Sequence, residues 1–199
     1  MNILDSKLYE KLNTIVDFVL LNLLWLLMCL PVITIFPATA ALFGVVRKWK
    51  MEKEPPLLKT YFVLFKENFI QSSLIGLIWT ALGAALYLDF TLVGGNVFLQ
   101  FLLLIMVSVY TIVSIYLFPV MVHYKNSVLH TIKNSFYLAI LKPLNLVISL
   151  VILYCSYLLL ISFPISILII GSTTAYFIYM ICLSTFQKAE KITTNVENI

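Results

Sequence analysis

Leu21–Lys50, LNLLWLLMCLPVITIFPATAALFGVVRKWK, is the stretch that decides the fold of this chain. It holds an apolar run of bilayer length, two prolines that interrupt it at Pro31 and Pro37, and an abrupt cationic end. A helix needs roughly 20 apolar residues to cross the hydrocarbon core of a membrane. The stretch therefore predicts an integral membrane protein, and the two prolines predict structural breaks in its backbone.

The overall composition agrees with this prediction. Hydrophobic residues make up 62% of the 199 residues and charged residues 11%, whereas soluble domains have about 45–50% and about 25%. No polar segment is long enough to bury a separate core, so we expect one membrane domain over residues 1–199. The three cysteines lie in apolar runs without metal-ligand spacing, and we expect no metal or other cofactor.

Five apolar runs are long enough to span a bilayer. They are residues 15–36, 70–88, 97–118, 143–161 and 164–185. Because lipid offers the backbone no hydrogen-bond partners, and the alternating pattern of a barrel strand is absent, each run is expected to be a helix. The predicted fold class is all-α, a polytopic transmembrane bundle.

The distribution of cations predicts its orientation. Lys and Arg gather in two basic segments, 38–69 and 120–142, and in the C-terminal tail, while 89–96 and 161–163 have none. Since short basic loops stay in the cytoplasm, we expect a multi-pass protein of the bacterial cell membrane with a cytoplasmic C-terminus.

The side of the N-terminus remains open between two readings. In the first, residues 15–36 span and the N-terminus lies outside. A weak duplication favours this reading, because Phe36-Pro37 and Phe118-Pro119 each end a span and precede a basic segment. In the second, residues 12–30 span alone, residues 31–37 turn, and residues 38–46 return as a re-entrant half-helix, which leaves the N-terminus inside.

The basic segments have the pattern of amphipathic helices that lie in the membrane interface. In the second segment the apolar stripe comprises Leu129, Ile132, Phe136 and Ile140. Cations between the first two spans suit either lipid headgroups or a docked partner; the candidates are Arg47, Lys48, Lys50 and Lys53.

Polar residues at membrane depth are few, which makes each a candidate. Asp17 reads either as a polar contact in the bundle or as an acid in a helix N-terminal turn. Asn22 is expected to hydrogen-bond a neighbouring helix rather than a ligand. Ser172, Thr173 and Thr174 form a hydroxyl cluster that either lines a small cavity or bonds back to its own helix.

Small residues recur on the second predicted span and predict close helix packing. They are Ser72, Gly76, Thr80, Gly83 and Ala84.

Catalytic signatures are missing from the sequence. His123 and His130 have no carboxylate or cysteine near them in sequence, and no phosphate-binding loop or HExxH motif occurs. We therefore expect no enzyme. The net charge of +4 follows from the cytoplasmic cations and gives no reason to expect a nucleic-acid partner.

Residues 20–49, with Leu8-Tyr9 upstream and the Phe62, Phe65, Asn68-Phe69 pattern downstream, resemble the YesL-like family of small bacterial membrane proteins, a domain of unknown function. Phe36 departs from the glycine that is common in the family at this position. The resemblance implies about five spans. It also implies genes that lie beside carbohydrate ABC importers, glycoside-degrading enzymes and sensor kinases.

Together these observations favour a non-catalytic accessory membrane protein, associated with a sugar ABC permease or a sensor kinase and otherwise with the lipid bilayer. The alternative is a small channel or facilitator for uncharged solutes such as oligosaccharides, in which Asn22 and the hydroxyl cluster line the path.

Overall fold

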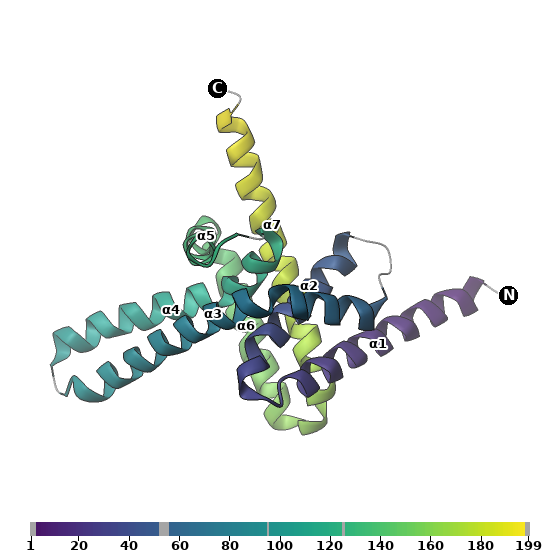
Figure 1. The fold of residues 1–199 in the computed structure, drawn as a ribbon, viewed down its shortest axis with the longest axis horizontal. Helices are drawn as coiled ribbons and strands as arrows, with labels where there is room; N and C mark the ends of the chain where they lie inside the picture. The colour runs from purple at the N-terminus through teal and green to yellow at the C-terminus, as the bar shows by residue number, and fades with distance from the viewer. Residues whose placement is uncertain (1–2, 52–55, 95, 125, 198–199) are drawn as a thin grey trace.

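The computed structural model describes residues 3–51, 56–94, 96–124 and 126–197, and its regular structure is entirely helical. The elements, in chain order, are α1 (Ile3–Met28), η1 (Val32–Thr34), α2 (Ile35–Met51), α3 (Leu57–Leu92), α4 (Val97–Tyr124), α5 (Val128–Leu141), α6 (Pro143–Ser162), η2 (Pro164–Leu168) and α7 (Ile170–Glu197). The predicted all-α class is confirmed (Figure 1).

Both predicted proline breaks lie at the corner between α1 and α2. α1 ends at Met28, Pro31 precedes the short 3-10 turn η1, and Pro37 lies in the first turn of α2, where its missing N–H costs no helix bond. The Thr34 hydroxyl donates to the carbonyls of Met28 (2.5 Å) and Pro31 (2.7 Å). The bond to Met28 thereby occupies a carbonyl oxygen in the last turn of α1, where the helix itself supplies no donor.

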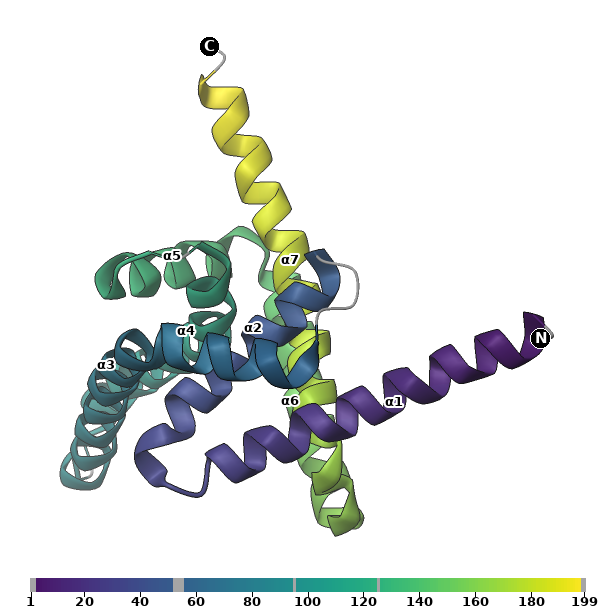
Figure 2. The same ribbon diagram turned by 45° about the vertical axis from the view of Figure 1, so that its right-hand side comes forward.

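The prediction of one continuous span over residues 15–36 is therefore wrong. Beyond the corner the chain turns back, so that α1 and α2 form a hairpin that opens toward the ends away from the break (Figure 2). Phe18 of α1 and Trp49 of α2 meet across it with ring centroids 5.1 Å apart. Only the re-entrant reading anticipated a reversal here, although α2 is longer than the half-helix it proposed.

α2 is the central helix of the bundle. It packs against α3, α4 and α7, and its buried residues are Pro37, Ala38, Ala40, Ala41, Leu42, Phe43, Gly44, Val45 and Val46. Small side chains along this helix let its neighbours approach closely. Residues 38–46, which were predicted to begin a basic cytoplasmic segment, instead belong to a stretch that is long and apolar enough to cross a membrane, Val32–Met51.

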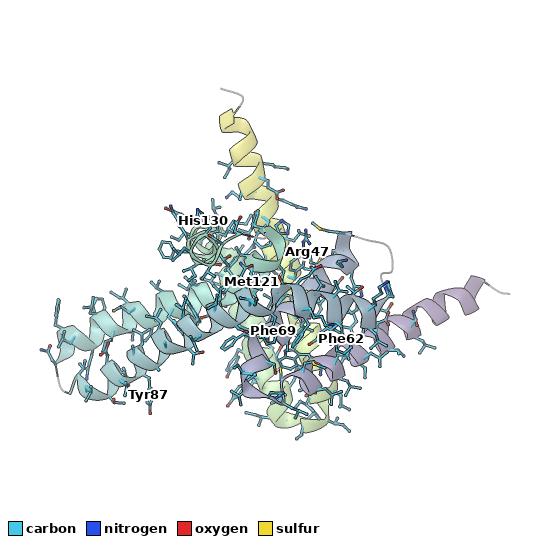
Figure 3. The ribbon with its side chains drawn as sticks, in the orientation of Figure 1. Arg47, Phe62, Phe69, Tyr87, Met121 and His130 are labelled. Carbon is cyan, nitrogen blue, oxygen red and sulfur yellow. The ribbon has the colours of Figure 1, made fainter. Side chains whose placement is uncertain are left out.

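α3 is a single helix of 36 residues and shows no boundary at residue 70, where a span was predicted to begin. The sequence from Leu57 to Leu92 contains no proline, and Lys66, Glu67 and Asn68 are compatible with a helix interior. With α4 it forms a long hairpin that projects from the bundle (Figure 1). Large apolar residues such as Tyr87, Phe98 and Phe101 are exposed along it, and Tyr87 lies near its tip in Figure 3.

The last three helices form the other side of the molecule. Lys142 separates α5 from α6, and Pro143 starts α6. The apolar turn η2 joins α6 to α7, so the predicted run 164–185 begins as a 3-10 turn before its helix starts at Ile170. The Asn145 amide of α6 donates to the hydroxyls of Ser184 (2.8 Å) and Thr185 (2.9 Å) in α7.

The duplication inferred from sequence does not extend to the helix ends. Pro37 lies in the first turn of α2, whereas Pro119 lies inside α4. The basic helix of the first unit is fused into α3, whereas that of the second, α5, stands alone.

Four stretches of the described chain are long and apolar enough to cross a bilayer: 32–51, 57–92, 97–124 and 143–162. Their lengths and hydropathy identify a membrane protein.

Candidate functional site

A polar cluster lies where α2, α4 and α7 meet. The side chain of His123 in α4 is 8% exposed; its Nδ1 lies 3.1 Å from the hydroxyl of Tyr179 and its Nε2 lies 3.5 Å from the carboxylate of Glu190. Arg47 of α2 also hydrogen-bonds the side chain of Tyr179, and Figure 3 shows Arg47 at this junction. The cluster joins three helices through charged and polar groups.

The contacts specify the hydrogen positions of the imidazole. A carboxylate only accepts hydrogen bonds, so Glu190 favours a proton on Nε2, which leaves Nδ1 to accept the proton of the Tyr179 hydroxyl. Aromatic rings enclose the group: the rings of Tyr124 and Phe186 lie 4.7 and 4.5 Å from that of His123. This arrangement orients His123 and screens it from solvent.

The sequence did not reveal this cluster, because Glu190 lies in the tail, far from His123 in the chain. Only the packing of α7 along α4 brings them together. His130 has a different role at the start of α5, where its Nδ1 lies 2.8 Å from the Ser127 hydroxyl. Among the described residues, no three His, Cys, Asp or Glu side chains come close enough to hold a metal ion.

A second polar contact fastens α1 to the start of α7. Asn22 is fully buried; its amide donates to the carbonyl of Ile167 (2.6 Å) and its oxygen accepts from the backbone N–H of Ser172 (2.9 Å). That N–H belongs to the first turn of α7 and has no partner within its helix. A Cβ at Gly171 would lie 2.5 Å from the Asn22 oxygen, so glycine permits this close approach.

The three hydroxyls after Gly171 have separate partners. The Ser172 hydroxyl donates to the carbonyls of Phe18 in α1 (2.8 Å) and of Ile169 (3.0 Å), and Thr173 donates to Ile169 (2.9 Å). Thr174 instead pairs with Ser156 of α6 at 2.7 Å. The prediction that these hydroxyls bond back along their own chain therefore holds for Thr173. Ser172 also bonds to α1, and Thr174 bonds only to α6 among the described residues.

Asp17 is half-buried in the middle of α1. The interpretation of an acid in a helix N-terminal turn is wrong, because α1 begins at Ile3 and Asp17 lies several turns inside it. The other interpretation, a polar contact in the bundle, agrees with its partly covered position.

The predicted small-residue stripe on α3 divides into two parts. Ser72 and Gly76 are buried, and a Cβ at Gly76 would lie 2.1 Å from the ring of Phe36 at the corner. Gly83 approaches the Tyr110 hydroxyl of α4, which would lie 2.7 Å from an added Cβ. Thr80 and Ala84, by contrast, are exposed.

The four candidate cations of the first basic segment also differ from one another. Arg47 is half-buried in the cluster, and its Nε is buried without a hydrogen-bond partner among the described residues. Lys50 places its ammonium 4.9 Å from the ring centroid of Tyr176. Lys48 is half-buried, and Lys53 lies outside the described residues. Arg47 therefore belongs to the interior and not to an exposed docking surface.

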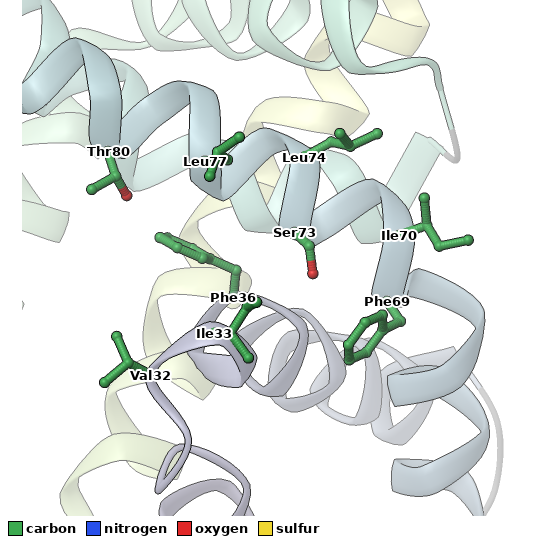
Figure 4. A pocket seen from close by; sticks show the side chains of 9 residues that line it. All are labelled: Val32, Ile33, Phe36, Phe69, Ile70, Ser73, Leu74, Leu77 and Thr80. Atoms are coloured by element: carbon green, nitrogen blue, oxygen red, sulfur yellow. The ribbon is translucent and has the colours of Figure 1, made fainter.

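An apolar groove of about 670 Å³ runs between the corner and α3. Val32, Ile33 and Phe36 form one wall, and α3 forms the other from Phe69 to Thr80 (Figure 4). Ser73 supplies a buried hydroxyl that has no partner in the described structure. The Thr80 hydroxyl bonds back to Gly76 (2.8 Å), so nearly all of the lining offers only van der Waals contact.

Comparison with known proteins gives a consistent result. A family described as "Protein of unknown function, DUF624" matches residues 18–90, from the middle of α1 to the end of α3. Three uncharacterized proteins of Bacillus subtilis (strain 168) are similar. YteU is 37% identical over 118 residues, YesL 31% over 134 and YesV 30% over 149. The matches cover 55%, 62% and 70% of this chain.

The matches cover 53% of YteU, 62% of YesL and 72% of YesV, so the chain spans less than two thirds of the first two relatives. No solved structure matches the chain.

Proposed function

This chain belongs to the YesL-like family, DUF624, and from that premise we propose that it is a non-catalytic accessory protein of the bacterial cell membrane that docks onto another membrane protein. The observation that carries the proposal is the groove between the corner and α3, which Thr80 lines at one end and which lies one helical turn from the exposed Ala84. Small residues on a transmembrane helix favour close approach by another helix.

The groove suits a partner helix for two reasons. Its lining is apolar and offers almost no hydrogen-bond partners, which suits a helix because a helix closes its own backbone hydrogen bonds. Its wall on α3 leads toward the projecting hairpin, whose apolar side chains are exposed. Dispersion contacts and close packing drive helix association in lipid, and this surface offers both.

The family resemblance suggests the partner. A permease of a carbohydrate ABC importer and a membrane sensor kinase both present transmembrane helices, and each fits the apolar, uncharged surface described above. We propose a sugar ABC permease or a sensor kinase as the docked protein.

A pull-down in mild detergent tests the docking site. Ala84→Trp places a large ring on the small-residue face and is expected to reduce recovery of the partner strongly. The matched control is Leu82→Trp, two residues earlier and thus on roughly the opposite side of α3, where the side chain is also exposed. Specific pull-downs that contain neither a permease nor a kinase, or equal loss with both variants, contradict the proposal.

The topology forms part of the proposal. Basic segments define the cytoplasmic side, and the Phe18–Trp49 contact sets the middle of α1 beside the basic end of α2. We infer that the N-terminus lies on the cytoplasmic side, in place of the outside position that the duplication favoured.

Cysteine accessibility tests this topology in a cysteine-free chain. A membrane-impermeant maleimide is expected to label Asn96→Cys, in the turn between α3 and α4, in intact cells. Asn13→Cys and Lys188→Cys are expected to react only after the cells are permeabilised. Labelling of Asn13→Cys in intact cells restores the topology with an outside N-terminus.

The channel for uncharged solutes has less support. Asn22, Ser172 and Thr173 direct their polar atoms to backbone groups of neighbouring or own helices, which leaves the Ser156–Thr174 pair between α6 and α7 as its main feature. Oligosaccharide flux into proteoliposomes above that of empty vesicles supports the channel. Flux at the level of empty vesicles removes it.

A further inference from the structure

Helix α5 buries hydroxyl side chains and exposes large apolar ones, which is the reverse of a helix on the surface of a soluble protein. The face that packs against the bundle carries Thr131 and Ser135, both fully buried, together with Leu138 and Ala139. The two hydroxyls donate to the carbonyls of Ser127 (3.0 Å) and Thr131 (2.8 Å) within the helix, so their burial leaves no unpaired donor.

The outer face of α5 carries large apolar side chains. Leu129 is 77% exposed, Ile140 60%, Tyr137 55% and Phe136 40%. They follow the helical period of 3.6 residues and form one continuous surface. Lys133 lies among them, exposed, with its ammonium 5.8 Å from the ring centroid of Tyr137. An apolar face with one cation at its middle is unsuited to bulk water.

The position of α5 relates this face to the bilayer. α5 lies across the ends of α4 and α6, roughly perpendicular to α7 (Figure 2). Lys142 is the single residue between α5 and α6, and its ammonium is held by the carbonyl of Ser184 at 2.9 Å. Beyond Lys142, the exposed apolar surface continues on α6 with Leu144 and Val147. α6 is one of the helices able to cross a membrane, so its exposed surface meets acyl chains.

We propose that α5 is an interfacial helix whose outer face inserts into the adjoining leaflet, and that Lys133 binds the phosphate groups of anionic phospholipids. An interfacial helix buries its apolar face at the boundary between headgroups and acyl chains. A lysine on that face extends its alkyl chain along the apolar surface and places its ammonium at the headgroups. The partner of this surface is the lipid bilayer itself, which distinguishes it from the protein-docking groove at α3.

The test uses the full-length chain without its native cysteines, reconstituted into vesicles. An environment-sensitive fluorophore is attached at Leu129→Cys or Ile140→Cys on the outer face, or, as the matched control, at Ser127→Cys, an exposed polar position directly before α5 and outside the apolar stripe. We expect nitroxide-labelled lipids to quench the first two probes and aqueous iodide to quench the third. Matching circular dichroism spectra verify that the variants retain their helices.

The lipid headgroup is tested separately. In vesicles of phosphatidylcholine, addition of phosphatidylglycerol is expected to increase lipid quenching at Leu129→Cys. This increase is expected to be lost with Lys133→Gln and retained with Lys133→Arg. An increase that survives Lys133→Gln overturns the role of Lys133 in headgroup binding.

Two outcomes overturn the insertion of α5. Equal access of iodide to the probes at positions 127, 129 and 140 shows that the outer face is in water. Protection of positions 129 and 140 from both quenchers shows that protein, such as a second copy of the chain, covers the face.

Discussion

Two regions of this membrane protein differ in how their helices meet. Where α1 packs on α7, buried polar groups form hydrogen bonds between helices, whereas the projecting hairpin of α3 and α4 exposes apolar side chains. In the contact between α1 and α7, Asn22 and Ser172 are fully buried and hydrogen-bonded to each other. Along the hairpin, the side chains are large, apolar and mostly exposed, and the two helices meet through isolated contacts such as Trp79 with Ser114. In lipid, apolar surface alone selects no partner, so polar contacts and close approach decide which helices pack.

The largest change in the free energy of unfolding is expected where α3 packs against the corner, at Gly76. In Gly76→Ala the new methyl group meets the Phe36 ring, and displacing that ring should lower the free energy of unfolding by about 3 kcal/mol. Unfolding in detergent is followed by a thiol-reactive dye that labels the buried Cys182, in a chain whose Cys29 and Cys155 are serine.

The control for that variant is Ala84→Leu, a small-to-large change at an exposed position of the same helix, which should leave stability nearly unchanged. The double variant Gly76→Ala with Phe36→Ala should recover part of the loss, because the clash is removed. Equal stability of Gly76→Ala and the parent protein would refute close packing at this site.

The next largest effect is expected for Asn22→Leu. It leaves the Ile167 carbonyl and the Ser172 N–H without their partner, and the expected loss is about 2 kcal/mol in the same assay. Asn13→Leu, an exposed change on the same helix, is the matched control and should have almost no effect. Similar losses for both variants would show that Asn22 contributes no specific contact.

A smaller effect is expected where the hairpin helices touch. Trp79→Phe removes the donation from the indole to the Ser114 hydroxyl (2.7 Å), while Ser114 keeps its own bond to the Tyr110 carbonyl (2.7 Å). A double-mutant cycle with Ser114→Ala should give a coupling free energy of about 0.6 kcal/mol, the average for such pairs in membranes. A coupling of zero would mean that this contact does not hold the hairpin together.

The smallest effect is expected on the outer surface of the hairpin. Leu88 is 57% exposed, and Leu88→Ala in detergent should change the free energy of unfolding by about 0.5 kcal/mol or less. A loss as large as that of Asn22→Leu would indicate that the isolated chain already buries this surface, for example in an oligomer.

Sequence reasoning predicted what depends on local composition. The length and hydropathy of the apolar runs predicted helices, the prolines marked the corner, and Asn22 was correctly expected to bond a neighbouring helix. The reversal of α2 was not predicted in the favoured topology, because a break does not reveal the direction in which the chain continues. The contact of His123 with Glu190 was missed because it depends on the register of α7 along α4.

The bonds of Asn22 also have a consequence for biogenesis. Its partners Ile167 and Ser172 follow it by 145 and 150 residues in the chain. During synthesis, Asn22 is therefore made long before the turn that binds it, and its side chain lacks both of these partners until α7 follows. The bonds of Asn22 that fasten the α1–α2 hairpin therefore form only after the first turn of α7 has been synthesised.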